Sequence, residues 1–218
     1  MRENTIREIE SNKIIVILRS IGKEKLIPLA EALYSGGIRL IEVTFSVEAR
    51  PSDAETAENI KMLAEHFAGR MQIGAGTVLN EEQVELVKKA GGSFIISPDT
   101  KPAVIKKTRE CGLVSIPGAM TPTEILAASE AGADFVKLFP VSVLGAEYIK
   151  AVKAPLRHVK LLAVGGVGEE NIRDYLSAGA SGVGIGASLT DRALIAAGRF
   201  EVITENAKRC VERIEALG

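Results

Sequence analysis

The chain has 218 residues, 46% of them apolar, so it is long enough to bury one sizeable core. Lys and Arg number 27 and Asp and Glu 28, and a formal net charge of −1 argues against nucleic acid or an anionic membrane as partner. No segment has the roughly 18 uninterrupted apolar residues of a membrane helix or the apolar stretch of a signal peptide, so we expect a cytoplasmic protein that acts on a small molecule.

Eight short runs rich in β-branched residues recur along the chain, and their spacing leaves room for a helix between successive runs. In chain order they are IIVILR from Ile14, LIEVTF from Leu40, MQIGAGTV from Met71, FIISP from Phe94, LVSIPG from Leu113, FVKLFP from Phe135, KLLAVGG from Lys160 and GVGIGAS from Gly182. Strands that alternate with helices predict a parallel sheet, and eight such units predict an α/β fold of the (β/α)8 TIM barrel type. We expect residues 1–218 to form a single barrel, with a short N-terminal helix and a long final helix that ends near Leu217.

Capping residues mark the helix boundaries. Capping patterns predict three helix starts, at Ser52-Asp53-Ala54-Glu55, Asn80-Glu81-Glu82-Gln83 and Thr121-Pro122-Thr123-Glu124. Glycine follows five amphipathic runs, in SGG from Ser35, AGG from Ala90, CG from Cys111 and AGA from Ala131 and from Ala178. We expect a left-handed C-cap at each of these glycines.

The cysteines and histidines indicate neither a disulfide nor a metal centre. Cys111 and Cys210 lie far apart without a ligand pattern near them, so we expect two reduced thiols. His66 falls on a helix face and His158 in a loop, and neither is placed for a zinc site.

Polar residues within the predicted strands stand out, because both faces of a strand in a parallel barrel are buried. These residues are Arg19, Glu42, Thr44, Thr77, Ser97 and Lys137. Most of them lie toward the C-terminal ends of their strands, where barrel enzymes carry their active sites. For Thr44 and Ser97, a hydroxyl bonded to nearby backbone explains the position equally well.

Lys137 interrupts an apolar strand, in DFVKLFP. A buried lysine has a lowered pKa and becomes a usable nucleophile for a ketone, and a glutamate such as Glu42 can move the protons that this reaction requires. Two simpler interpretations remain open. Lys137 could reach solvent from a strand end, or Glu42 and Lys137 could form an ion pair that only neutralises two buried charges.

Glycines form a second cluster, in the turns after the last two strands. Gly165-Gly166 ends the seventh strand and Gly184-Ile185-Gly186-Ala187-Ser188 ends the eighth, with a helix predicted directly afterwards. In this fold these two loops often bind phosphate through backbone N–H groups and a helix N-terminus. Tight packing is the alternative explanation for the glycines.

Six motifs together resemble a known family. They are IEVTF around Glu42, GAGTV from Gly74, FIISP from Phe94, IPGAMTPTEI from Ile116, VKLFP from Val136 and GGV from Gly165. Their order and spacing are similar to those of the bacterial 2-keto-3-deoxy-6-phosphogluconate (KDPG) aldolases, which also act on 4-hydroxy-2-oxoglutarate. The resemblance covers nearly the whole chain.

The resemblance implies a class I retro-aldol reaction, without metal or cofactor, that yields pyruvate and an aldehyde on a homotrimeric barrel. It implies that Lys137 is the Schiff-base lysine and Glu42 the general acid/base, and that Arg19 and Thr77 hold the pyruvate carboxylate. It further implies that Phe139 packs beside the imine, that Pro98 and Pro117 shape the pocket, and that the phosphate is held at Gly165, Gly166, Gly186, Ala187 and Ser188. We add Thr44 as a candidate substrate contact, because it shares a strand face with Glu42.

Three positions depart from the family pattern. Ser46 stands where some members carry an arginine, so the carboxylate would depend more on Arg19. Val164 replaces a threonine whose hydroxyl usually faces the substrate, and Ala187 replaces a serine at the phosphate turn. These departures leave the lysine chemistry intact, and those at Val164 and Ala187 leave open how the distal end of the substrate is bound.

The leading expectation is an aldolase that cleaves KDPG to pyruvate and glyceraldehyde 3-phosphate. Relatives acting on 4-hydroxy-2-oxoglutarate, 2-keto-3-deoxy-6-phosphogalactonate or another 2-keto-3-deoxy acid are the alternatives within the class. An alternative of another class is a phosphate-binding barrel isomerase or synthase in which Lys137 only pairs with a substrate anion. A non-catalytic sugar-phosphate binder ranks last, because burial of Lys137 and Glu42 would then cost desolvation free energy without serving a reaction.

Overall fold

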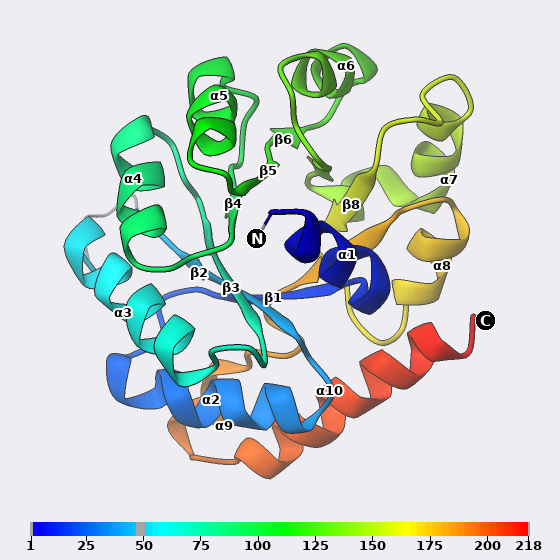
Figure 1. Ribbon diagram of the computed structural model, residues 1–218. Helices are drawn as coiled ribbons and strands as arrows, with labels where there is room; N and C mark the ends of the chain where they lie inside the picture. The colour runs from blue at the N-terminus through cyan, green and yellow to red at the C-terminus, as the bar shows by residue number, and fades with distance from the viewer. Residues whose placement is uncertain (1, 47–50, 218) are drawn as a thin grey trace.

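A computed structural model of the chain describes residues 2–46 and 51–217. Within these residues nine parallel strands form one nearly closed barrel, in the order β5-β4-β3-β2-β1-β9-β8-β7-β6, surrounded by helices (Figure 1). The strands are β1 (Ile14–Leu18), β2 (Leu40–Thr44), β3 (Gln72–Gly76), β4 (Phe94–Ile96), β5 (Val114–Ile116), β6 (Gly118–Ala119), β7 (Val136–Leu138), β8 (Leu161–Val164) and β9 (Gly182–Ile185). The predicted barrel class is confirmed.

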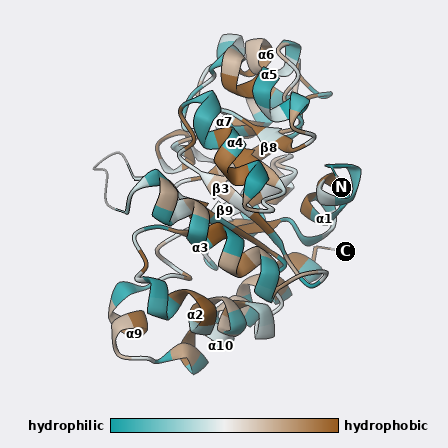
Figure 2. Cartoon of the chain, turned by 60° about the vertical axis from the view of Figure 1, so that its left-hand side comes forward, coloured by the Kyte–Doolittle hydropathy of each residue, from teal (hydrophilic) through white to brown (hydrophobic). Residues whose placement is uncertain are grey.

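The helices alternate with the strands, as the sequence predicts. They are α1 (Arg2–Asn12), α2 (Lys23–Ser35), α3 (Asp53–His66), α4 (Glu81–Lys89), α5 (Pro102–Glu110), α6 (Pro122–Glu130), α7 (Val141–Lys153), α8 (Ile172–Ser177), α9 (Arg192–Ala196) and α10 (Phe200–Glu215). The helix before the first strand and the long final helix are both present. In Figure 2 helices such as α3 and α4 carry hydrophilic and hydrophobic residues together, as amphipathic helices on a buried sheet do.

The predicted fifth strand is divided into two, β5 and β6. The break falls at Pro117, which has no backbone N–H to donate to a neighbouring strand. The carbonyl of Pro117 still accepts a hydrogen bond of 2.8 Å from the amide of Lys137 in β7. Because β5 and β6 are the two ends of the strand order, the barrel closes through this continuous segment of chain.

The predicted caps are present. Ser52 with Glu55, and Thr121 with Glu124, form complete capping boxes, and the Asn80 side chain accepts a hydrogen bond from the amide of Gln83. A glycine with positive φ follows each of the five predicted helix ends: Gly37, Gly91, Gly112, Gly132 and Gly179. Local chemistry therefore fixes where the helices begin and end.

The apolar core has two parts. One cluster fills the space between the strands and the outer helices. The other lies inside the barrel and consists of Ile9, Ile15, Leu40, Phe94, Ile96, Val114, Ile116, Phe135, Leu162 and Val164. Ile9 belongs to α1, which lies across the N-terminal end of the barrel and closes it (Figure 1).

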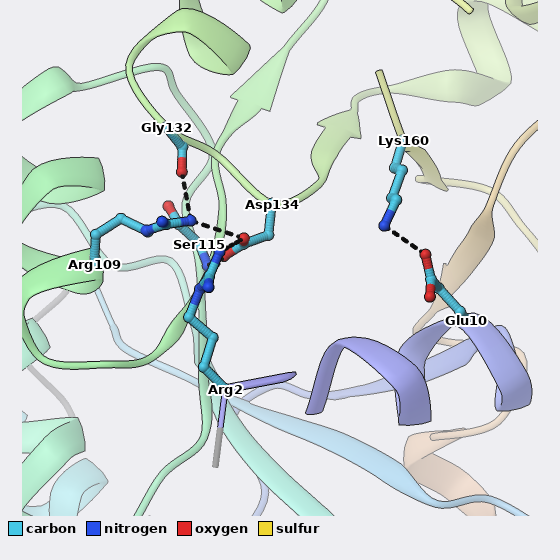
Figure 3. A network of polar contacts seen from close by, with 7 residues as sticks. All are labelled: Arg2, Glu10, Arg109, Ser115, Gly132, Asp134 and Lys160. Carbon is cyan, nitrogen blue, oxygen red and sulfur yellow. Dashed lines mark hydrogen bonds and ion pairs between the residues drawn. The ribbon is translucent and has the colours of Figure 1, made fainter. Parts of the chain in front are cut away.

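Polar contacts hold α1 in this place (Figure 3). The carboxylate of Asp134, whose side chain is only 5% exposed, pairs with Arg2 of α1 and with Arg109 of α5 and accepts a hydrogen bond from the amide of Ser115. A second ion pair, of 2.6 Å, joins Lys160 to Glu10 of α1.

The cysteines are two free thiols, as predicted. Cys210 is buried in α10, and this burial raises the pKa of its thiol to about 11. In the part of the chain that the structure describes, no helix is long and apolar enough to cross a membrane. The same residues contain no group of three or more acidic, His or Cys side chains arranged for a metal ion.

Candidate active site

A cleft of about 960 Å³ opens at the C-terminal ends of the strands. All the predicted site residues except Thr44 and Pro117 line it: Arg19, Glu42, Thr77, Pro98, Lys137, Phe139, Gly165, Gly166, Gly186, Ala187 and Ser188. Residues more than 160 positions apart thus meet because the C-terminal ends of parallel strands share one end of the barrel.

Lys137 lies at the base of this cleft. It is the central residue of β7 and is 7% exposed, so it is not a strand-end lysine that extends into solvent. Its Nζ lies 4.7 Å from the centre of the Phe139 ring. Burial lowers the pKa of Lys137; the negative charge of Glu42 opposes this shift, and the positive charge of Arg19 reinforces it.

Glu42 lies in β2 and is 2% exposed. Burial raises the pKa of its carboxyl group, and the charges of Lys137 and Arg19 partly offset that rise. Its Oε2 atom has no hydrogen-bond partner among the described residues. The two buried groups are therefore coupled through their charges.

Arg19 and Thr77 lie together at the end of β1 and β3. The Arg19 guanidinium donates a hydrogen bond of 3.3 Å to the Thr77 hydroxyl. Thr77 has a φ of 57°, which is uncommon for a β-branched residue and is typical of strained positions at functional sites. A guanidinium beside a hydroxyl suits a carboxylate ligand.

Thr44 and Pro117 support the site from outside the cleft lining. The Thr44 side chain is buried, and its hydroxyl donates to the Leu18 carbonyl at 3.4 Å, which is the backbone role that the sequence left open. Pro117 contacts the site through its carbonyl, which binds the Lys137 amide.

The loop after β8 is braced by Asn171. Its side-chain amide donates to the Gly166 carbonyl at 2.9 Å, and its side-chain oxygen accepts from the Gly168 amide at 3.0 Å. The Ser188 hydroxyl in turn donates to the Val167 carbonyl at 3.1 Å, which joins the two glycine-rich loops. The predicted helix does not follow Ser188 directly; a hydrogen-bonded turn intervenes before α9.

Among the backbone N–H groups of these loops, those of Gly166, Gly186, Ala187 and Ser188 have no acceptor within residues 2–46 and 51–217. Unpaired amides at the edge of a cleft form a site that an anion can fill. Sequence reasoning found these residues through their glycines.

Sequence reasoning missed the charged rim of the cleft. Glu170, Asp191 and Arg192 line its outer part. Loops carry no hydrophobic period that would indicate which side chains turn inward, so the only signal was Asp191 as an N-cap, whose side chain accepts from the Leu194 amide.

A family profile described as "Aldolase: KDPG and KHG aldolase" matches residues 5–206. The chain belongs to the KDPG and KHG aldolase family. Members of this family are aldolases, a class of lyases, and act on small keto-deoxy acids.

Individual aldolases support the assignment. The chain is 42% identical over 177 residues, 81% of each chain, to a probable 2-dehydro-3-deoxy-6-phosphogalactonate aldolase from Rhizobium meliloti. A structure described as native KDPGal is 31% identical with a TM-score of 0.83, and covers 93% of this chain and 94% of its own. A KDPG aldolase from Legionella pneumophila, solved with pyruvate captured as a covalent carbinolamine intermediate, is 27% identical with a TM-score of 0.83 over 93% of this chain and 96% of its own.

Proposed function

We propose that this aldolase cleaves 2-keto-3-deoxy-6-phosphogalactonate to pyruvate and glyceraldehyde 3-phosphate through a Schiff base on Lys137. The observation that carries the proposal is a buried lysine with a lowered pKa, at the base of a cleft that Glu42 also lines. The neutral Nζ atom attacks the C2 ketone to form a carbinolamine, and loss of water gives an iminium ion. The covalent carbinolamine reported for the Legionella aldolase supports this first step.

The iminium ion accepts the electron pair that bond cleavage releases. Glu42 removes the proton from the C4 hydroxyl, the C3–C4 bond breaks to release the aldehyde, and its electrons form an enamine. Protonation of the enamine at C3 and hydrolysis of the imine then release pyruvate and regenerate Lys137. The raised pKa of Glu42 suits a group that both accepts and donates protons near neutral pH.

The two ends of the cleft suit the two anionic ends of this substrate. Arg19 and Thr77 supply a cation and a hydroxyl for the carboxylate of the keto acid. At the other end, the unpaired amides of Gly166, Gly186, Ala187 and Ser188 supply donors for the phosphate. Ala187 lacks the hydroxyl usual in the family, so backbone amides carry more of this interaction.

Val164 favours the galactonate epimer. Phosphogluconate and phosphogalactonate forms of the substrate differ in the configuration of the C4 hydroxyl. Val164 lines the cleft in β8 and presents an apolar side chain where the resemblance leads one to expect a threonine hydroxyl. The names of two similar proteins, from Rhizobium meliloti and in the native KDPGal structure, point to the same epimer. KDPG, the leading expectation from the sequence, is the second candidate substrate.

Kinetics with both epimers tests the substrate assignment. We expect a higher kcat/KM for the phosphogalactonate form. Val164→Thr should shift the ratio of the two kcat/KM values about tenfold toward KDPG, because one added hydrogen bond contributes a free energy that corresponds to about this factor. A wild-type preference for KDPG would contradict the assignment while leaving the lysine chemistry intact.

Borohydride reduction in the presence of pyruvate tests the Schiff base. We expect peptide mass spectrometry to locate the reduced pyruvate adduct on Lys137, and Lys137→Met to abolish both adduct and turnover with little loss of fold. Lys160→Met is the matched control, because Lys160 pairs with Glu10 at the opposite end of the barrel. An unmodified Lys137 in folded wild-type protein would favour the isomerase or synthase alternative instead.

We also propose a homotrimer. Three apolar side chains near α6 and α7, none of them in the lining of the cleft, are exposed: Met120, Leu126 and Val143, the last of them 74% exposed. Exposed apolar residues that gather on one side of a protein commonly mark an interface. The mass in solution should be that of three chains, and Val143→Glu should reduce it; a monomeric wild type would refute the proposal.

A further inference from the structure

The carboxylate of Glu42 occupies space that a glycine leaves open in the next strand. In the register of β2 and β3, Glu42 lies opposite Gly74 and Thr44 lies opposite Gly76. The Glu42 side chain nevertheless extends toward the C-terminal end of β3, and its carboxylate lies over Gly76. A Cβ atom built on Gly76 would lie 2.5 Å from Glu42 Oε1 and 2.7 Å from Cδ, closer than real Cβ contacts come.

Thr44 bounds the same space. The Cβ position on Gly76 is 3.0 Å from Thr44 Cγ2, and the Thr44 hydroxyl is directed to the Leu18 carbonyl. The Glu42 carboxylate therefore lies next to Thr44 and over the bare backbone of Gly76. We call this space the Gly76 slot.

Neither the backbone nor hydrogen bonding explains the slot. Gly76 is a strand residue and does not have the positive φ that requires glycine, so alanine fits its backbone conformation. Glu42 Oε2 has no hydrogen-bond partner among the described residues that would hold the carboxylate in place. Besides the charges of Lys137 and Arg19, the shape of the slot is therefore what restrains the direction of this side chain.

We propose that Gly76 is a positioning residue, which sets the place of the Glu42 carboxylate relative to Lys137. The inference rests on the proposed aldolase chemistry. An added methyl group at position 76 meets the end of a flexible side chain, so Glu42 moves and the backbone does not. A displacement of about 1 Å at a catalytic group can cost on the order of a hundredfold in rate.

Gly76→Ala tests the inference. We expect kcat to fall about 10- to 100-fold, since general acid/base catalysis contributes at least that much, while KM changes less than about threefold. Gly74→Ala is the matched control in the same strand. Its Cβ would lie 2.4 Å from the Phe94 ring, so it should lower the melting temperature and leave kcat of the folded protein nearly unchanged.

A double-variant cycle separates positioning from general damage. Glu42→Asp shortens the side chain by one methylene and withdraws it from the slot, so Gly76→Ala should lower kcat less than about threefold in that background. If Gly76→Ala does not fold, Thr44→Ser removes the other wall of the slot and should lower kcat about 3- to 10-fold. The melting temperature should fall only slightly, because one buried methyl group is lost.

Two outcomes would overturn the inference. The first is full kcat in Gly76→Ala or, if that variant does not fold, full kcat in Thr44→Ser. The second is an equal loss of kcat from Gly76→Ala in the wild-type and Glu42→Asp backgrounds. Pyruvate trapping on Lys137 of the wild type distinguishes the cause. An adduct combined with either result refutes only the role of Gly76, whereas the absence of an adduct refutes the proposed function and this inference together.

Discussion

Lys137 and Glu42 each shift the pKa of the other, and Arg19 acts on both. The negative charge of Glu42 raises the pKa of Lys137, and the positive charge of Arg19 lowers it. Burial has the largest effect and favours the neutral amine. Besides burial, Glu42 and Arg19 set the pH at which Lys137 becomes nucleophilic. Both can be substituted without changing the lysine itself.

The pH dependence of imine formation tests this coupling. Only the neutral amine attacks pyruvate, so the rate should rise as the pH increases through the pKa of Lys137. Glu42→Gln removes a group that raises this pKa, so the rise should move to lower pH while the maximal rate falls. Arg19→Gln removes a group that lowers it, so the rise should move to higher pH. The rate of pyruvate-dependent inactivation by borohydride measures both, and shifts in the same direction would contradict the coupling.

At the scale of the element, α1 is a lid on the barrel interior. Its Ile9 joins the cluster inside the barrel, and Arg2 and Glu10 bind Asp134 and Lys160 on the barrel itself (Figure 3). The α1 helix is mostly polar, so these few contacts give it a fixed position. The lid lies at the end of the barrel opposite the cleft, which predicts an effect on stability and not on chemistry.

Asp134→Asn tests the role of the lid. The change leaves Arg2 and Arg109, whose side chains are 29% and 39% exposed, without their shared counter-charge. Solvent screens these arginines in part, so the free energy of unfolding should fall by about 2 kcal/mol, less than when a fully buried charge is left unpaired. Urea denaturation gives this value, and kcat of the folded variant should stay unchanged. Glu110→Gln is the control, because its pair with Lys106 is exposed and should contribute less than about 1 kcal/mol. Equal losses in the two variants would contradict the special role of Asp134.

The sequence predicts the elements well because each carries a local signal. β-branched runs mark the strands, and residues such as Ser52 and Gly37 mark helix ends through their own side-chain or backbone chemistry. The division of the fifth strand at Pro117 could be suspected from proline alone, but its place as the closing point of the barrel depends on strand order. Contacts such as that of Glu42 with Gly76 depend on strand register and on side-chain rotamers, and no local sequence pattern predicts these.

At the scale of the whole molecule, closure of the barrel places β4, β6 and β7 around one point. The Gly118 amide donates to the Asp99 carbonyl at 3.1 Å, and Gly118 lies opposite Lys137 in the register of β6 and β7. The backbone of Pro98 comes so near that a Cβ atom on Gly118 would lie 2.4 Å from the Pro98 carbonyl oxygen. Gly118 therefore contacts both the strand end at which the barrel closes and the strand that carries Lys137.

Gly118→Ala tests this link. Here the added methyl group meets backbone, which cannot move aside as the end of a side chain does, so the free energy of unfolding should fall by about 2 kcal/mol, as in other overpacked sites. Gly118 lies opposite Lys137 in the register of β6 and β7, so a shift of its backbone should move Lys137 and lower kcat as well. This loss of activity separates Gly118→Ala from Asp134→Asn. Urea denaturation and steady-state kinetics on the folded variant measure the two effects, with the exposed Thr123→Ala as control. A loss of stability at full kcat would show that the barrel can adjust its closure without moving Lys137.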